Sequence, residues 1–140
     1  MTKTEHYHLN QWEPADRVLM TDFNEDNRKI DEALGAKCEL VFGTYGGNNN
    51  DNRAIHLGFR PKAVFLCTED GKTYNNAAYL GGLALDGFPA KGESTATGKI
   101  NLITVTDQGF TVRNGAVQSG SGTYISANLQ GRMYHYIAFR

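Results

Sequence analysis

The residues best suited to chemistry in this sequence are two tyrosines beside asparagine-rich stretches. Tyr45 leads into Gly46–Asn52, and Tyr74 precedes a second pair of asparagines. Sugars stack on aromatic rings and exchange hydrogen bonds with planar amides, so this combination is typical of glycan contacts. The alternative is that both clusters are solvated turns, whose asparagines tolerate left-handed backbone angles. The candidate binding residues are Tyr45, Asn48, Asn49, Asn50, Asp51, Asn52, Tyr74, Asn75 and Asn76.

Metal ligands are sparse. On an extended strand His6 and His8 would face the same side, and threefold symmetry would bring six nitrogens to one axis. A solvated N-terminal tail is the alternative, which the shortness of the motif favours. Asn48–Asn52 offers oxygen atoms but lacks the terminal glutamate and the spacing of an EF-hand. We therefore predict no metal and no cofactor, and leave a metal at His6 and His8 open.

No catalytic arrangement stands out in the sequence. Gly120-Ser121-Gly122 lacks the spacing of a nucleophile elbow. Cys38 and Cys67 each lie in an apolar run, which predicts buried free thiols rather than activated nucleophiles. The phosphate loop, the dinucleotide fingerprint and a glycosidase-like carboxylate pair are also missing. The sequence therefore predicts that this protein is not an enzyme.

The composition argues against two classes of partner, nucleic acid and anionic membrane. The 140 residues carry a formal net charge of −1, so there is no basic excess to favour nucleic acid or anionic membrane. No apolar run approaches the roughly 20 residues that span a bilayer. Residues 1–20 contain charges and a Trp-Glu-Pro break where a signal peptide needs an unbroken apolar stretch. We therefore expect synthesis in the cytoplasm without export.

Near residue 37 the net charge changes from negative to positive and the hydrophobic pattern also changes. These changes predict a segment 1–37 and a domain 38–140. In the first segment, Thr21 or Asp22 is the expected cap of a helix that ends at Gly35. Its apolar residues recur at spacings of three, four and seven; they are Phe23, Ile30, Ala33 and Leu34. A helix of about 13 residues is marginal alone, so this stripe must pack against the following domain or against copies of itself.

From residue 38 the hydrophobic period becomes two, which is typical of a β-sandwich or barrel with about six to eight strands. Lys62–Thr68 is apolar on both faces, so we expect a central strand with Phe65 in the core. Asp70-Gly71 and Asn114-Gly115 are predicted tight turns. The predicted strands are Glu39–Tyr45, Arg53–Phe59, Lys62–Thr68, Leu80–Asp86, Lys99–Thr106, Gly109–Arg113, Thr123–Asn128 and Arg132–Phe139, and the predicted loops are Gly46–Asn52, Phe88–Gly98 and Gln118–Gly122.

The first segment resembles the opening of small tail proteins from phages and prophages of Firmicutes, where it is an attachment segment. The matching residues are Tyr7, Leu9, Gln11, Trp12, Glu13, Asp16, Arg17, Asp22, Phe23, Asn24, Asp26, Asn27, Lys29, Ile30, Asp31, Ala33 and Leu34. The resemblance covers about a fifth of the chain. In a helix bundle, Asn27 within the apolar stripe would set the register of the copies.

The remainder is similar to C-terminal domains of tail-fibre and baseplate proteins. The layout is also similar to that of H-type lectins, trimeric six-stranded sandwiches that bind sugars, although their sugar-binding residues have no clear counterparts here. The matching stretches are Leu57-Gly58-Phe59-x-Pro61-Lys62-Ala63-Val64, Val105-Thr106-x-x-Gly109-Phe110-x-Val112 and Tyr134-x-Tyr136-Ile137-Ala138-Phe139.

These resemblances imply a structural protein of a virion tail, a tail-fibre or baseplate appendage that contacts host-surface glycan. The implied partners are other tail proteins and two further copies of the chain in a homotrimer. Phe23, Ile30 and Leu34 are the expected trimerisation residues. A free lectin-like carbohydrate-binding module is the alternative.

Overall fold

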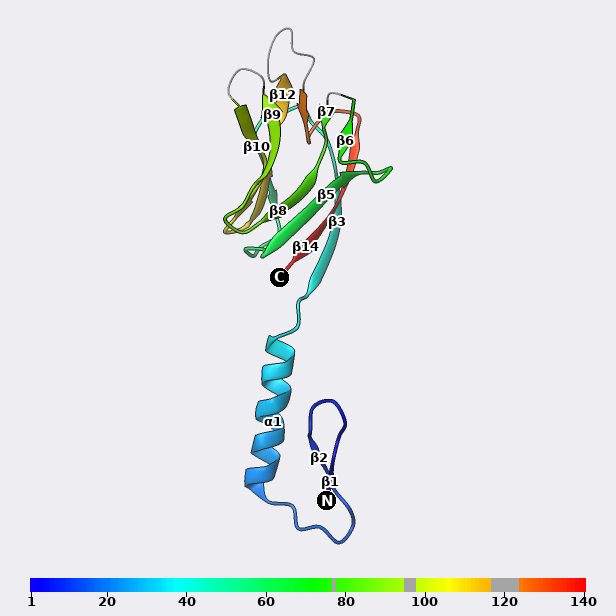
Figure 1. The fold of residues 1–140 in the computed structure, drawn as a ribbon, viewed down its shortest axis with the longest axis vertical. Helices are drawn as coiled ribbons and strands as arrows, with labels where there is room; N and C mark the ends of the chain where they lie inside the picture. Colours follow the sequence, from blue (N-terminus) through cyan, green and yellow to red (C-terminus); the bar gives the residue numbers. More distant parts are fainter. Residues whose placement is uncertain (77, 95–97, 117–123) are drawn as a thin grey trace. The chain divides into compact units, whose positions relative to one another are not determined.

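The computed structural model describes residues 1–76, 78–94, 98–116 and 124–140. Strands predominate among them (Figure 1). The chain divides into two compact units, Met1–Cys38 and Glu39–Arg140, one residue beyond the predicted boundary. The elements of the first unit are β1 (Thr2–Lys3), β2 (Asn10–Gln11) and α1 (Met20–Gly35). The elements of the second unit are β3 (Leu40–Gly46), β4 (Arg53–His56), β5 (Ala63–Thr68), β6 (Tyr74–Asn75), β7 (Ala78–Tyr79), β8 (Gly82–Leu85), β9 (Ala90–Ser94), β10 (Gly98–Thr106), β11 (Gly109–Val112), β12 (Asn114–Ala116), β13 (Tyr124–Ser126) and β14 (Met133–Phe139).

In the first unit, β1 and β2 form a small antiparallel hairpin beside α1 (Figure 1). The backbone N–H of Asn10 donates to both carboxylate oxygens of Asp26, at 3.1 and 3.0 Å. The Lys29 ammonium donates to the His8 carbonyl at 2.9 Å. The hairpin is therefore held to the helix by polar contacts along one side of α1.

The start of α1 differs from the prediction. Met20 is the first helical residue, and Leu19 occupies the N-cap position without a side-chain hydrogen bond, so neither Thr21 nor Asp22 is the cap. Asp22 lies instead in the first turn, where its negative charge faces the positive end of the helix dipole. The helix ends at Gly35, as predicted.

Three four-stranded sheets build the second unit. The main sheet has the order β3-β14-β5-β8, and all its neighbours are antiparallel. The second sheet has the antiparallel order β4-β11-β10-β9. The third sheet, β12-β13-β7-β6, includes one parallel pair, β13 with β7. The mainly β, largely antiparallel class with one helix is confirmed, whereas a sandwich of six to eight strands is not, because the described residues form fourteen strands in four sheets.

One hydrophobic cluster joins the sheets of the second unit. It draws on the inward-facing side chains of each sheet, as the alternation of a half-buried strand requires. Its buried members are Tyr45, Val64, Leu66, Ala84, Leu102, Ile103, Val105, Phe110, Val112, Ile125, Ala127, Tyr134 and Ala138.

Strand β14 turns its two tyrosines and Ala138 toward this core. Tyr134 is fully buried, and its hydroxyl donates to the Ser126 carbonyl at 2.5 Å and accepts the Leu129 N–H at 3.0 Å. The Tyr136 ring fills the space beside Gly43, where an added Cβ would lie 2.2 Å from the ring. The aliphatic side of β14 consequently faces outward.

Most predicted strands coincide with observed strands. Two segments that were predicted to connect strands instead contribute residues to strands. Phe88–Gly98, a predicted loop, contains β9, which pairs with β10 around the buried Gly92. Asn114-Gly115, a predicted turn, lies in β12 because it pairs with β13. Asp70-Gly71 does form a turn. The predicted loop Gln118–Gly122 lies outside the described residues.

Strand β5 is internal to the main sheet, as predicted, but the position expected for Phe65 is wrong. Val64 and Leu66 are fully buried, whereas Phe65 faces outward and is 37% exposed. The apolar pattern on both faces of β5 arises because the outer side of the sheet is itself apolar. Within the described residues, no element covers Phe65 completely.

Candidate functional site

Tyr45, the first candidate binding residue, belongs to the core. Its side chain is 7% exposed, its ring stacks on Tyr134 with centroids 5.0 Å apart, and its hydroxyl donates to the Ala127 carbonyl at 2.6 Å. Burial raises the pKa of this phenol far above its ordinary value. A ring without a solvent-facing surface cannot stack on a sugar, so the prediction for Tyr45 is wrong. Tyr45 is buried because side chains alternate along β3, which places it on the same inward side of the strand as Val41 and Gly43.

The loop after β3 is held by a residue that the sequence analysis did not single out. The Asn128 side chain is fully buried, and its Nδ2 donates to Asn48 Oδ1 at 2.6 Å and to the Asn50 carbonyl at 2.8 Å. Its Oδ1 accepts from Arg53 Nη1 at 3.0 Å and from the Asn48 N–H at 3.3 Å. Two donated and two accepted bonds saturate the amide. Asn128 therefore fixes the backbone of this loop.

The other asparagines of the loop combine backbone and side-chain roles. Asn49 and Asn52 adopt left-handed φ angles of 65° and 58°, as the solvated-turn alternative requires. The Asn49 side chain exchanges two hydrogen bonds with Gln130, at 2.8 Å to its N–H and 3.2 Å to its amide oxygen. Asn50 and Asn52 are exposed to solvent. The part of the loop that can meet a ligand is therefore centred on Asn50 and Asn52.

Asp51 anchors the far side of the loop to β12. Its carboxylate accepts two hydrogen bonds from the Arg113 guanidinium, at 2.7 and 3.0 Å, and one from the Asn114 N–H at 3.0 Å. The Arg113 hydrogen bond lowers the pKa of Asp51 below its ordinary 3.8, burial opposes this, and the Asn114 N–H adds to the lowering. Asn114 is the first residue of β12, so Asp51 ties the loop to the third sheet.

This anchor predicts an acid-sensitive loop. The folded-state pKa of Asp51 lies below that of the unfolded chain, so the anchor stabilises the fold above a pH of about 4 and is lost as the pH falls through the folded-state pKa. Both partners are partly exposed, so we expect a contribution below about 1 kcal/mol. In NMR titrations the amide resonances of residues 49–52 and of Asn114 should shift together on acidification. In Asp51→Asn the same resonances should stay constant, and a titration identical to that of the parent would contradict the anchor.

The second candidate cluster lies at a distance from the first. Tyr74 is 52% exposed on β6, and its ring meets Tyr79 edge-on with centroids 5.0 Å apart. Asn75 is exposed in the same strand, and Asn76 has a left-handed φ of 51°. Strand β6 is one edge of the third sheet and β12, which bears Asn114, is the other. These two edge strands are three strand spacings, or roughly 14 Å, apart, so the two clusters are associated with opposite edges of the third sheet.

A third surface was not predicted: the outward side of the main sheet, which we call the outer face. The strand register aligns its side chains in rows that cross the sheet. The middle row is Phe42, Ile137, Phe65 and Leu83. The flanking rows are Leu40, Phe139, Ala63 and Leu85 on one side, and Thr44, His135 and Cys67 on the other.

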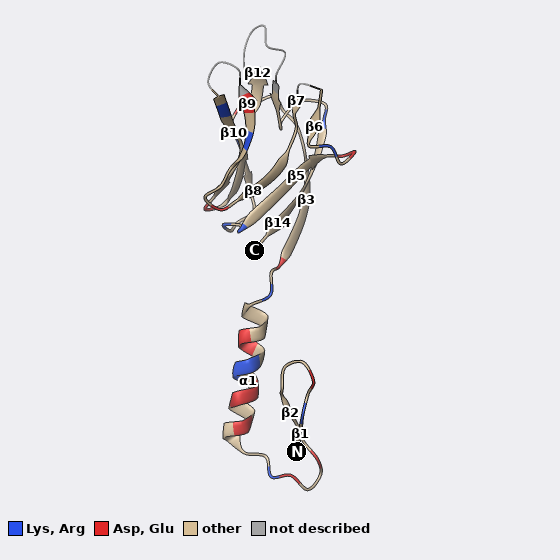
Figure 2. Cartoon of the chain, in the orientation of Figure 1, with Lys and Arg blue, Asp and Glu red and all other residues tan. Residues whose placement is uncertain are grey.

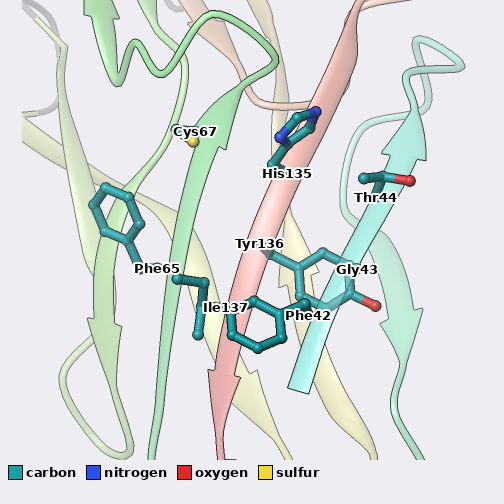
Figure 3. Close-up of a pocket in the computed structure, with 8 residues that line it drawn as sticks. All are labelled: Phe42, Gly43, Thr44, Phe65, Cys67, His135, Tyr136 and Ile137. Atoms are coloured by element: carbon teal, nitrogen blue, oxygen red, sulfur yellow. The ribbon is translucent and has the colours of Figure 1, made fainter. Parts of the chain in front are cut away.

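The centre of the outer face forms an open groove of about 490 Å³ (Figure 3). Side chains of β14 lie between those of β3 and β5. The Tyr136 ring, on the inward side of β14, also lines the groove because Gly43 has no side chain to cover it. The lining residues are Phe42, Gly43, Thr44, Phe65, Cys67, His135, Tyr136 and Ile137. A lining so rich in apolar side chains suits burial of another apolar surface rather than recognition of a polar ligand.

The two thiols differ from the prediction. Cys38 is exposed and Cys67 is half-buried on the outer face, so the expectation that both are buried is wrong. Burial, with a smaller effect of Asp70, raises the pKa of Cys67, which makes it a poorer nucleophile. Among the described residues, no three His, Cys, Asp or Glu side chains gather closely enough to hold a metal ion. In the same residues, no helix is long and apolar enough to cross a membrane.

Comparisons with protein-family models, curated proteins and solved structures found no match to this chain. Exposed apolar side chains gather in two places among the described residues, on the outer face and along the apolar stripe of α1.

Proposed function

We propose that this protein is a structural subunit of a phage-type tail, a tail-fibre or baseplate appendage that forms a homotrimer through α1. The observation that carries the proposal is an uncovered helical seam. We define the seam as Met20, Phe23, Asn27, Ile30 and Leu34, whose spacing alternates between three and four residues. Its apolar members are between 41% and 79% exposed, and no residue of α1 is buried.

The other sides of α1 carry polar and charged side chains that already have partners within the first unit. Asp26 and Lys29 face the hairpin through the contacts described above. Arg28 pairs with Glu25 at 2.6 Å and with Glu32 at 2.5 Å on a charged, solvent-exposed side. The seam is thus the side of the helix that neither the hairpin contacts nor the charged side chains occupy. Ala33, predicted as part of the apolar stripe, is half-buried and lines a small recess with Tyr7, Lys37 and two residues of the seam, Ile30 and Leu34.

Identical parallel helices are the simplest partner for such a seam. Alternating spacings of three and four are those of a coiled coil, in which the same positions of each copy meet around the axis. Asn27 in the middle of the seam would favour one register, because its amide pairs only with the Asn27 of other copies. The resemblance of residues 7–34 to phage tail proteins supports a trimer that attaches to a tail.

The second unit would then present its polar loops to the host surface. Asn50, Asn52 and Tyr74 are exposed on short, anchored segments, which limits the entropy lost when they bind a glycan. Tyr45 has no part in this proposal.

Immunogold electron microscopy tests the tail assignment. Antibodies raised against the purified chain should label the tails of particles induced from the strain that encodes it. Pre-absorbing the antibodies with purified protein is the control and should abolish the label. Intact particles without label, while the free protein binds a glycan array as a monomer, would contradict the proposal and favour the lectin-like alternative.

A further inference from the structure

We infer that the outer face of the main sheet is a contact surface between copies of this chain, so that the second units pack on one another in the assembly. This inference rests on the proposed trimer and adds the surface that the β units use. Its occupants are the same faces of the other two copies, which meet around the axis of the proposed trimer.

The outer face carries no charge that would repel an identical copy. Not one residue of its three rows is Asp, Glu, Lys or Arg. Figure 2 shows charged residues at the ends of β3 and β5, with the strands themselves free of them. An uncharged apolar face can meet itself without burying like charges, whereas a charged face would pay a large desolvation cost.

The area of the outer face supports the same occupant. Four strands about 4.8 Å apart and three rows about 6.8 Å apart cover about 400 Å². This is about half of the roughly 800 Å² that each partner buries in a typical stable complex. The seam of α1 is short and contains an asparagine, so it is also insufficient alone. The outer face therefore adds about 400 Å² to the area that the seam of α1 can bury.

The chain itself links the two surfaces. The seam ends at Leu34 and the outer face begins at Leu40, the first residue of β3. Residues 36–39 are the whole connection, and four residues span at most about 14 Å. Copies joined through α1 therefore hold their β units at a high effective concentration, at which a weak apolar contact becomes occupied.

Alkylation of Cys67 reports on this contact, because its thiol lies on the outer face beside His135. The chain has two cysteines, so Cys38→Ser leaves Cys67 as the single probe. The maleimide reaction rate is measured with the light-scattering mass in this background and in three further variants. Ile30→Asp breaks the seam, Phe42→Thr with Leu83→Thr alters exposed positions of the face, and Leu129→Thr changes an equally apolar exposed residue outside it.

We expect Cys67 to react about tenfold more slowly, or slower still, in the assembled parent than in Ile30→Asp. The double variant should remain folded by circular dichroism yet react quickly, and Leu129→Thr should behave like the parent. A trimeric parent whose Cys67 reacts as fast as in Ile30→Asp would overturn this inference and leave the proposed function standing. A monomeric parent would overturn the proposed trimer, and a monomer with a protected Cys67 would show that the chain covers its own face.

Discussion

Replacing Asn128 with leucine should lower the free energy of unfolding by about 3 to 5 kcal/mol, because several groups lose their partners in a buried site. The Asn50 carbonyl and the Asn48 N–H each lose the hydrogen bond made by this amide. The Arg53 guanidinium loses one acceptor and keeps the Gly46 carbonyl at 2.7 Å. A leucine of similar volume fills the space without replacing any of these bonds, so the loss is electrostatic rather than a packing defect.

Chemical denaturation measures this effect, and Asn49→Gly is its matched control, because glycine adopts the left-handed φ of 65° at this position without strain. Asn49 belongs to the same loop but makes its side-chain bonds to Gln130 at the surface, so we expect a loss below about 1 kcal/mol. The difference between the two variants isolates the buried position. An Asn128→Leu protein that unfolds within about 1 kcal/mol of the parent would show that the loop does not depend on this residue.

The second large effect concerns assembly. Ile30→Asp places a carboxylate in the middle of the seam, where three copies would bring three like charges together. We expect the particle mass to fall from three chains to one at micromolar concentration, with the second unit still folded. Thr21→Asp adds the same charge to α1 outside the seam and should leave the mass unchanged. Equal masses for Ile30→Asp and its parent would remove α1 from the interface.

The strands of the second unit could be predicted because their side chains alternate between the core and the outside. β14 illustrates this, with Tyr134 and Ala138 inward and His135 outward. β9 escaped prediction because Ala90–Ser94 has no strong β-formers, and its pairing with β10 is decided by tertiary contacts.

The candidate site was predicted less well, for two physical reasons. A tyrosine before a polar loop can belong to the loop or to the inward side of the strand, and Tyr45 belongs to the strand. Asn128, whose side-chain hydrogen bonds hold the loop in place, lies 80 residues beyond Asn48 in the sequence. No local sequence pattern reveals a contact across that separation. The outer face did leave a signal, since β5 is apolar at every second position on both sides. That pattern predicts contact on both faces but does not say whether the same chain or another copy supplies it.

The molar mass of the full chain by sedimentation equilibrium tests the central claim most directly. The account predicts three times the chain mass of 15.4 kDa at micromolar concentration, because the seam of α1 and the outer face are both uncovered in one copy. A mass of 15.4 kDa at the same concentration would contradict it.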